Sequence, residues 1–365
     1  MDTAVTQQRP VLSQLGAIDC DVHPDAPGRD DLLPYFDDYW REIVTTRDVD
    51  RLELTNFPTR TKPFFREDWK KTEGKGVEKL RKNLLDPFGL KYAILNCVTA
   101  VHAIYDPYLA TAVCRATNDW LKAEWLDRDP RLRASLVLPM QNPEAAVEEI
   151  ERFAGDKRFV QVLALCMGEM PLGRRIYWPI YEAAQRHGFA LGVHAGSAYR
   201  HAPSQSGFLS YLAEDYVHQI QGFAAQVGSF VAEGVLGKFP DMKIVLIESG
   251  VSWLPGQMWR MSKDWRGARI EIPWVKEPPS ALVRRQIRMT TQPFDAPRDP
   301  AELERIIEHL DCDDMLLFST DYPHAQFEGE AAIPAGFPER LLDRLVRDNA
   351  LATYPRLPRN SGLED

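Results

Sequence analysis

The sequence lacks the features that mark membrane and secreted proteins. No uninterrupted apolar run approaches the ~20 residues that a membrane-spanning helix needs, and residues 1–13 are too polar for a secretory signal peptide. Only 5 of the 365 residues are cysteine, an odd number with no Cys-x-x-Cys pair. This usage is typical of reduced thiols in a reducing compartment. We therefore expect a cytoplasmic protein with no membrane partner.

Glycine-rich phosphate-binding loops are also missing. Neither G-x-G-x-x-G nor G-x-x-x-x-G-K-[ST] occurs, which argues against an open, doubly wound dinucleotide-binding sheet. The 44 basic residues are outnumbered by 53 acidic ones, giving a formal net charge of −9, and such a field repels nucleic acid. With 44% hydrophobic and 27% charged residues, the composition is that of a folded, enzyme-sized globular protein.

What the sequence does contain is an alternation of short apolar runs with longer stretches of helical periodicity. Eight runs have the character of buried strands: 18–23, 92–96, 133–140, 159–166, 190–196, 243–250, 286–293 and 315–323. Helix candidates between them include 108–126, 143–154, 176–187, 218–238 and 300–310. Eight such repeats close a barrel of parallel strands. We predict an α/β fold, a (β/α)8 TIM barrel, as a single domain over residues 17–355 with tails at 1–16 and 356–365.

Two connections are longer than ordinary crossovers. Residues 24–90 separate the first two strands, and residues 197–242 separate the fifth from the sixth. Both follow a strand, so both should lie at the C-terminal face of the barrel, where this fold builds its sites. The first insertion carries aromatic residues that need a larger surface to bury against, namely Tyr35, Phe36, Trp40, Phe64, Phe65 and Trp69. We predict that residues 24–90 form a cap or arm on the barrel or on a second subunit.

Ionisable residues gather at three of the predicted strand ends. In the first strand, Asp19, Asp21 and His23 alternate and should share one face. His194 lies at the end of the fifth strand, and Asp321 lies at the end of the eighth. Because strand ends converge on one opening in a barrel, Asp21, His23, His194 and Asp321 should surround one pocket. Two imidazoles and two carboxylates suit a divalent cation, and we expect one or two ions per chain, zinc first, then manganese or iron.

Three further residues are candidates for the same pocket. Glu248 follows the sixth strand, where it would be a general base or a ligand of a second metal, unless it simply pairs with an arginine. His218 and His324 are candidate ligands of a second ion; the alternatives are a capping or solvent-facing role for His218 and orientation of a neighbour for His324. We interpret His102 as structural and Arg200 as an exposed loop residue.

These residues resemble the metal site of the amidohydrolase superfamily. More narrowly, the chain resembles the amidohydrolase-related branch, which includes aminocarboxymuconate semialdehyde decarboxylase, γ-resorcylate decarboxylase, and lactone and amide hydrolases. The resemblance runs from about residue 17 to about residue 355, with further similar phrases at 234–241, 248–255 and 349–354. Most superfamily members have His-x-His, and the decarboxylases often Glu-x-His, where this chain has Asp21-x-His23. The decarboxylases resemble one another in a histidine at the end of strand six, where this chain has Glu248.

The resemblance implies a ranked set of functions. The first is a metal-dependent hydrolase of a small amide, lactone or similar carbonyl substrate, in which Asp321 moves the proton of a metal-activated water and Glu248 or His218 assists. The second is a dinuclear non-haem iron or manganese oxygenase, and the third is a non-oxidative decarboxylase, which Glu248 makes less expected. A non-catalytic barrel subunit beside an active paralogue is the fourth, although the intact ligand set argues against it. We expect a small-molecule substrate and a homo-oligomer, or a hetero-oligomer with a paralogue.

Overall fold

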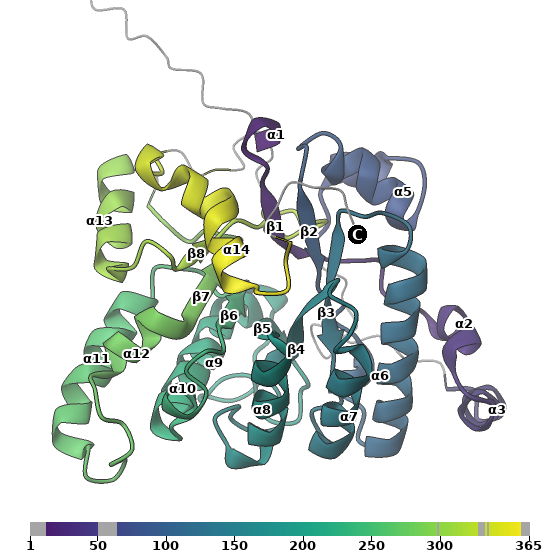
Figure 1. Ribbon diagram of the computed structural model, residues 1–365, viewed down its shortest axis with the longest axis horizontal. Coiled ribbons are helices and arrows are strands. Elements are labelled where there is room, and N and C mark those ends of the chain that lie inside the picture. The colour runs from purple at the N-terminus through teal and green to yellow at the C-terminus, as the bar shows by residue number, and fades with distance from the viewer. Residues whose placement is uncertain (1–11, 50–63, 298, 328–332, 334–335, 359–365) are drawn as a thin grey trace, which may run out of the picture.

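A computed structural model describes residues 12–49, 64–297, 299–327, 333 and 336–358. Eight parallel strands pair in sequence order and form a barrel wall with helices on its outside (Figure 1). The strands are β1 (Ile18–Val22), β2 (Tyr92–Leu95), β3 (Leu132–Val137), β4 (Phe159–Met167), β5 (Ala190–Ser197), β6 (Ile244–Ile247), β7 (Ile287–Thr290) and β8 (Leu316–Leu317). The predicted (β/α)8 TIM barrel is confirmed.

The barrel closes where the segment after β8 returns to β1. Val22 pairs with Tyr322 in an isolated parallel bridge, and the backbone N–H of Cys20 donates to the carbonyl of Phe318 at 2.9 Å. These bonds bring the first and last strands together although about 300 residues separate them. The C-terminal ends of all eight strands therefore face one opening.

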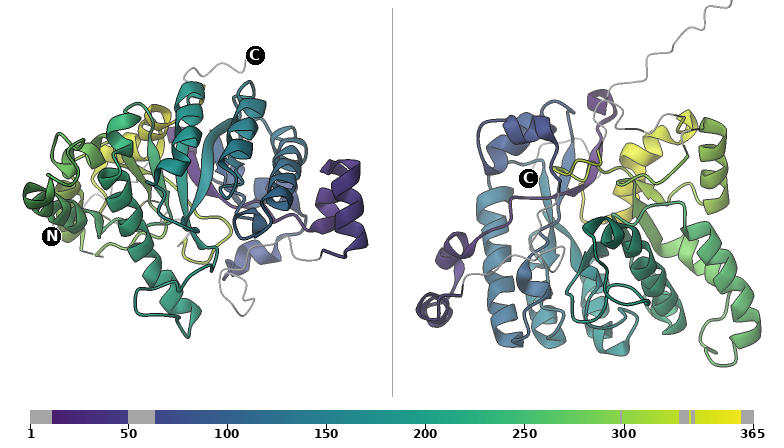
Figure 2. Two further views of the ribbon diagram at one scale, coloured as in Figure 1. Left: turned by 90° about the horizontal axis from the view of Figure 1, so that it is seen from below. Right: turned by 180° about the vertical axis from the view of Figure 1, so that it is seen from behind.

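The helices that follow the strands cover the outer face of the barrel (Figures 1 and 2). They are α6 (Pro107–Leu121), α7 (Pro143–Phe153), α8 (Trp178–His187), α9 (Leu212–Ala232), α10 (Val235–Lys238), α11 (Leu254–Ala268), α12 (Pro279–Gln286), α13 (Pro300–Leu310) and α14 (Asn349–Thr353). Four of them begin at a proline, whose fixed φ and missing N–H suit the first helical position. Asp106 additionally caps α6, because its carboxylate accepts the N–H groups of Tyr108 and Leu109. No helix in the described part of the chain is long and apolar enough to cross a membrane.

The insertion after β1 contributes α2 (Arg29–Leu32), α3 (Asp38–Thr46), α4 (Glu67–Lys71) and α5 (Gly76–Leu80). Helices α2 and α3 lie beside α6 at the edge of the barrel (Figures 1 and 2). The buried Trp69 of α4 stacks on Phe327, with ring centroids 5.7 Å apart, and contacts Tyr322 at 4.8 Å. Among the aromatic residues of the insertion, Phe36 is buried and Phe64 is exposed. Helix α4 thus packs on the segment after β8, and the role of the whole insertion as a cap stays a prediction.

The ends of the chain reach further into the fold than predicted. Residues 12–15 of the predicted N-terminal tail form helix α1 (Leu12–Leu15). At the other end, the Arg356 side chain is buried and donates to the carbonyl oxygens of Phe159 at 2.5 Å and His187 at 2.9 Å. The other predicted tail residues, 1–11 and 359–365, and residues 50–63 of the insertion lie outside the described residues.

Several strands end earlier than the sequence suggested. The predicted strands 133–140, 243–250, 286–293 and 315–323 are β3, β6, β7 and β8, which stop at Val137, Ile247, Thr290 and Leu317. Glu248, the residue after β6, has a φ of 59°, in the left-handed region. An extended strand cannot pass through such a residue, so β6 stops before this carboxylate. Asp321, with a φ of 55°, lies beyond the end of β8.

Two helices also differ from their predicted ranges. The predicted helix 218–238 begins six residues earlier, at Leu212, because the Glu214 carboxylate accepts the N–H groups of Ser210 and Tyr211 and fixes the first turn. It ends at Ala232, and Gly234, with φ of 86°, separates it from α10. The predicted helix 108–126 is α6 followed by a π-helical turn over Lys122–Leu126.

Candidate metal centre

Six ionisable side chains meet at the C-terminal ends of β1, β5, β6 and β8. They form two overlapping groups, in each of which the available ligand atoms lie within 4.8 Å of one another. The first group is Asp21, His23, His194 and Glu248, and the second is His23, Glu248, Asp321 and His324. We call these six residues the cup. His23 and Glu248 belong to both groups and therefore mark the middle of the cup.

His23 has carboxylate oxygens around it. Its Nε2 lies 3.1 Å from Oε1 of Glu248, 3.3 Å from Oδ1 of Asp321 and 3.6 Å from Oδ1 of Asp21. Nε2 of His194 lies 3.6 Å from the same oxygens of Asp21 and Glu248. Two imidazole nitrogens and three carboxylates thus lie close together. This is the nitrogen and oxygen ligand set that the sequence predicted.

The surrounding carboxylates change the acid–base properties of both imidazoles. Burial opposes the charged form of His23, but hydrogen bonds to Asp321 and Glu248 outweigh it, so the pKa of His23 lies well above its ordinary value. Burial also opposes the charged form of His194, yet the charge of Glu248 and the proximity of Asp21 raise the pKa of His194. Without a cation, protons therefore compensate the negative charge of the cup.

His324 closes the side of the cup nearest the β1 insertion. Its Nδ1 lies 2.6 Å from Oδ1 of Asp321 and 3.7 Å from Oε1 of Glu248. Burial acts to raise the pKa of Asp321, but the charge of His324 and the hydrogen bonds from His23 and His324 act more strongly, so this pKa lies below its ordinary value. The ring of Phe65 stacks on His324 with centroids 5.9 Å apart, and the two residues form an antiparallel bridge. The insertion after β1 therefore borders the cup.

Backbone strain is concentrated at two residues of the cup. Glu248 and Asp321 both have positive φ, which is uncommon for residues other than glycine. The N–H of Glu248 donates to the Thr290 hydroxyl at 3.0 Å, so β7 helps to hold this conformation. Strained residues of this kind persist where the surroundings enforce them, and they cluster at functional sites. Glu248 follows β6 directly, and Asp321 lies beyond the end of β8.

The residues of the cup fit a divalent cation. Oδ2 of Asp21 and Nε2 of His194 are buried and have no hydrogen-bond partner among the described residues. A buried carboxylate oxygen and a buried imidazole nitrogen are costly to leave unpaired. Carboxylate oxygens and imidazole nitrogens are metal ligands, and both residues belong to the first group. A cation bound there would satisfy them and would offset the repulsion among Asp21, Glu248 and Asp321.

Two residues that the sequence placed at the site lie apart from both groups. His218 lies on the second turn of α9, and its buried Nδ1 has no hydrogen-bond partner in the part of the chain that the structure describes. Asp19 was expected to share a face with Asp21 and His23, but the pairing of β1 with β2 is irregular between Asp19 and Val22. Its carboxylate accepts the hydroxyl of Thr320 at 2.6 Å and the N–H of Thr320 at 3.1 Å. Burial raises the pKa of Asp19 to about 7.

Two residues that were not predicted to belong to the site lie near the opening. His102 is 8% exposed, and none of the described residues forms a hydrogen bond with its Nε2. Burial and the charge of His194 lower the pKa of His102 to about 4, so its ring is neutral at physiological pH. The Arg200 side chain is only 10% exposed. It lies 3.9 Å from the centroid of the Tyr105 ring and donates to the carbonyl of Ile104 at 2.7 Å, so its interpretation as solvent-exposed was wrong.

Asn96 was not among the predicted site residues, yet its Nδ2 donates to Oδ1 of Asp21 at 2.8 Å. Ser135 and Gln161 lie beside it in the barrel interior. The available signal was a polar residue in each of three strands that otherwise read as apolar.

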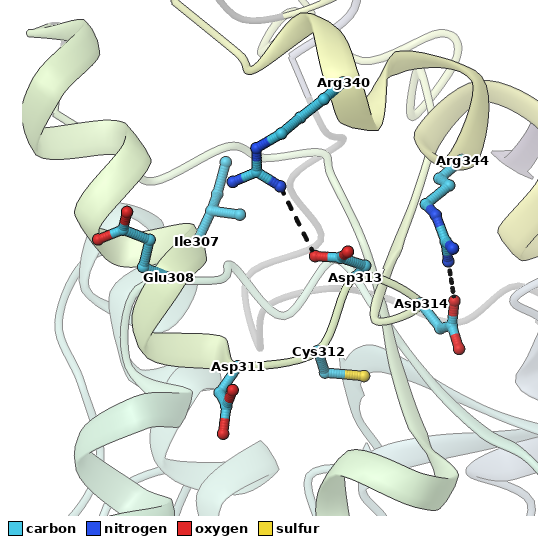
Figure 3. A pocket seen from close by; sticks show the side chains of 8 residues that line it. All are labelled: Ile307, Glu308, Asp311, Cys312, Asp313, Asp314, Arg340 and Arg344. Carbon is cyan, nitrogen blue, oxygen red and sulfur yellow. Dashed lines mark hydrogen bonds and ion pairs between the residues drawn. The ribbon is translucent and has the colours of Figure 1, made fainter.

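A pocket of about 500 Å³ lies away from the cup, between α13 and the segment that leads into β8 (Figure 3). Its charged residues are largely paired: Asp313 lies 3.8 Å from Arg340, and Asp314 lies 2.5 Å from Arg344. Asp314 precedes β8, so this pocket is at the opposite end of that strand from Asp321. The acidic cup and this pocket are therefore separate features.

Known proteins show similarity over most of the chain. The γ-resorcylate decarboxylase of Polaromonas sp. (strain JS666 / ATCC BAA-500) is 28% identical over 287 residues, which cover 72% of this chain and 83% of that protein. The crystal structure of an amidohydrolase from Mycobacterium avium subsp. paratuberculosis K-10 has a TM-score of 0.70 at 21% identity and covers 92% of this chain and 98% of that one. A dihydroxybenzoic acid decarboxylase from Polaromonas sp. JS666, with bound manganese and the inhibitor 2-nitroresorcinol, has a TM-score of 0.64 at 22% identity, covering 93% and 97%. The sequence profile of the family described as Amidohydrolase matches residues 18–356. The chain therefore belongs to the amidohydrolase family.

Proposed function

We propose that the protein is a metal-dependent, non-oxidative decarboxylase of a small hydroxylated aromatic acid. The observation that carries this proposal is the similarity to a γ-resorcylate decarboxylase over 72% of the chain, in a chain whose cup gathers ligand atoms within 4.8 Å. Sequence analysis ranked decarboxylation below hydrolysis and oxygenation because of Glu248. The comparisons favour decarboxylation over both.

The proposed ligands are Asp21, His23, His194 and Asp321, with Glu248 as a further ligand. When bound, a divalent cation would neutralise the carboxylates and attract the oxygens of an anionic substrate. The manganese in the Polaromonas decarboxylase structure supports manganese as the first ion to test. Without this compensation, the acidic cup would repel a carboxylic acid.

Decarboxylation replaces a carbon–carbon bond with a carbon–hydrogen bond, so the site must supply one proton as carbon dioxide leaves. His324 is the proposed donor. Its side chain is 13% exposed, whereas Asp321 is 4% exposed, and the 2.6 Å contact with Asp321 orients the ring. Oε1 of Glu248, whose side chain is also 13% exposed, lies 3.7 Å from Nδ1 of His324, so Glu248 would border the substrate as well as the cation. The remaining residues of the cup would hold the cation.

The test uses the purified chain loaded with manganese and a panel of hydroxybenzoic acids that begins with 2,6-dihydroxybenzoate. We expect loss of the acid with equimolar release of carbon dioxide and no uptake of oxygen. The matched control is the His194→Ala variant, which should bind little metal and release no carbon dioxide. Absence of carbon dioxide from every acid, together with hydrolysis of an amide or lactone, would overturn the proposal.

One observation favours a second candidate, a dinuclear hydrolase or oxygenase. Glu248 belongs to both groups of the cup, and a carboxylate can bind two neighbouring cations at once. Metal analysis separates the candidates. Two ions per chain with oxygen uptake would support the oxygenase, and two zinc ions with hydrolysis would support the hydrolase. One ion per chain with carbon dioxide release would support the decarboxylase.

A further inference from the structure

The interior of the barrel contains a row of polar side chains that leads to Asp21. Gln161 lies on β4, Ser135 on β3, Asn96 directly after β2, and Asp21 on β1, so the row crosses four neighbouring strands. All four residues are fully buried. Polar groups in such a position are unfavourable unless they are hydrogen-bonded. Aliphatic side chains usually fill the interior of such a barrel, so the presence of these polar residues calls for an explanation.

The hydrogen bonds of the row all run toward Asp21. Nε2 of Gln161 donates to Oγ of Ser135 at 2.7 Å and to Oδ1 of Asn96 at 3.0 Å. The Ser135 hydroxyl donates to the same Asn96 oxygen. With its oxygen occupied twice, Asn96 presents its NH2 group to Oδ1 of Asp21 at 2.8 Å. An ionised carboxylate can only accept, so the charge of Asp21 sets this direction for the whole row.

Strand β5, next to β4, leaves space for Gln161, the residue of the row farthest along the sheet from Asp21. A Cβ atom on Gly192 of β5 would lie 3.0 Å from Cδ and from Oε1 of Gln161. A larger residue at this position would thus press on the Gln161 amide. The strand that carries His194 therefore also provides room for the row. Strand β5 thus contributes His194 to the cup and leaves space for Gln161.

We propose that Asn96, Ser135 and Gln161 are positioning residues that set the orientation of Asp21 for cation binding. The inference rests on the proposed metal centre. Asn96 donates to Oδ1 of Asp21, the oxygen that lies 3.6 Å from Nε2 of both His23 and His194. A metal-binding carboxylate is commonly fixed by a hydrogen bond from outside the ligand set, and loss of such a bond lowers metal affinity about 10- to 100-fold. The row thus prevents rotation of the Asp21 side chain and fixes the oxygen that faces the two imidazoles.

The experiment measures manganese affinity in the full-length chain, without reference to turnover. Asn96→Leu removes the bond to Asp21, and Gln161→Leu removes the far end of the row without touching Asp21. Gln286→Leu is the matched control: Gln286 is equally buried and donates to the carbonyl oxygens of Phe239 and Met242, outside the row. We expect about 10- to 100-fold weaker binding for Asn96→Leu, a smaller loss for Gln161→Leu and none for Gln286→Leu. The electron paramagnetic resonance spectrum of bound manganese should change only in the first two.

A purely structural role gives a different result. In that case all three variants would lose stability to a similar degree in the metal-free state, and the folded fraction of each would bind manganese as the wild type does. That outcome overturns the proposal, as does failure of the wild type to bind any divalent cation. If Asn96→Leu does not fold, Gln161→Leu decides the question. If the wild type binds manganese but releases no carbon dioxide from any acid, the proposed decarboxylase is wrong while this test still applies.

Discussion

Replacing Glu248 by glutamine is the change that most directly tests the cup. The substitution keeps the size of the side chain and an oxygen that can accept from His23, whose Nε2 lies 3.1 Å from Oε1. It removes the negative charge and weakens the residue as a ligand. Because Glu248 belongs to both groups of the cup, its loss affects cation binding whether the site holds one ion or two.

The magnitude follows from the linkage between binding and stability. A ligand at 100 times its Kd stabilises the folded state by about 2.7 kcal/mol. Removal of an interaction outside the ligand set already weakens metal binding about 10- to 100-fold, so we take about 100-fold for Glu248→Gln. At the same metal concentration the stabilisation then falls to RT ln 2, about 0.4 kcal/mol. The metal-free variant should unfold much like the metal-free wild type, because the hydrogen bond from His23 is retained.

The assay is urea unfolding with and without manganese, together with the metal content after desalting. Glu182→Gln is the matched control, since Glu182 is an exposed residue of α8. We expect the manganese-dependent stabilisation to be kept in Glu182→Gln and largely lost in Glu248→Gln. If Glu248→Gln keeps full stabilisation while His194→Ala loses it, Glu248 is not a ligand and the second group does not bind a cation.

Four other predictions test the remaining features. Manganese affinity should rise with pH, because the carboxylates raise the pKa values of His23 and His194 and each imidazole must lose its proton to bind metal; calorimetry in buffers of different ionisation enthalpy will detect the released protons. His218→Ala should keep its metal, as His218 lies in neither group; a loss like that of His194→Ala would contradict this. Between pH 3.8, the ordinary pKa of an aspartate, and about pH 7, Asp19 keeps its proton in the folded metal-free protein but loses it in the unfolded chain, so the free energy of unfolding should fall by up to about 4 kcal/mol as the pH rises through this window. Urea titrations at several pH values should show a smaller fall in Asp19→Asn. Trp69→Ala should lower the free energy of unfolding by about 3–5 kcal/mol, because the ring is buried against the segment after β8, and a loss below about 1 kcal/mol would show that α4 is not firmly packed.

Much of the barrel was predictable because strand and helix alternate with different periods. Each strand has a run of buried apolar residues, and each predicted run overlaps the observed strand. The six cup residues were predictable because strand ends converge in this fold. What sequence could not show was where a strand ends when the next residue adopts a left-handed conformation, as Glu248 does. The hydrophobic pattern shows which side chains are buried, and it carries no information on a residue whose backbone changes from the extended to the left-handed conformation.

His218 and Asn96 show the corresponding limit for the site. The sequence placed His218 in the connection after the fifth strand, near the opening of the barrel. The Glu214 cap, however, starts α9 early, so that His218 lies on the second turn of this helix. Asn96 was overlooked because one polar residue at the end of an apolar run is usual. Its proposed role depends on Asp21, which accepts a hydrogen bond from it on the neighbouring strand β1, and on Gln161, which donates a hydrogen bond to it from β4. Pairing between strands fixes such contacts, and spacing along one strand does not contain them.

The cup combines several unfavourable features that a cation would relieve together. Asp21, Glu248 and Asp321 bring three carboxylates to one opening, two of them on strained backbone. Within the described residues, one oxygen of Asp21 is buried without a partner. In the metal-free state, protonation of His23 and His194 offsets part of this repulsion. Protonated imidazoles cannot bind metal, so the cation must displace the protons that offset the repulsion among the carboxylates. Metal occupancy, proton release and stability are therefore linked through the same side chains, and a substitution that alters one should alter all three in the same direction.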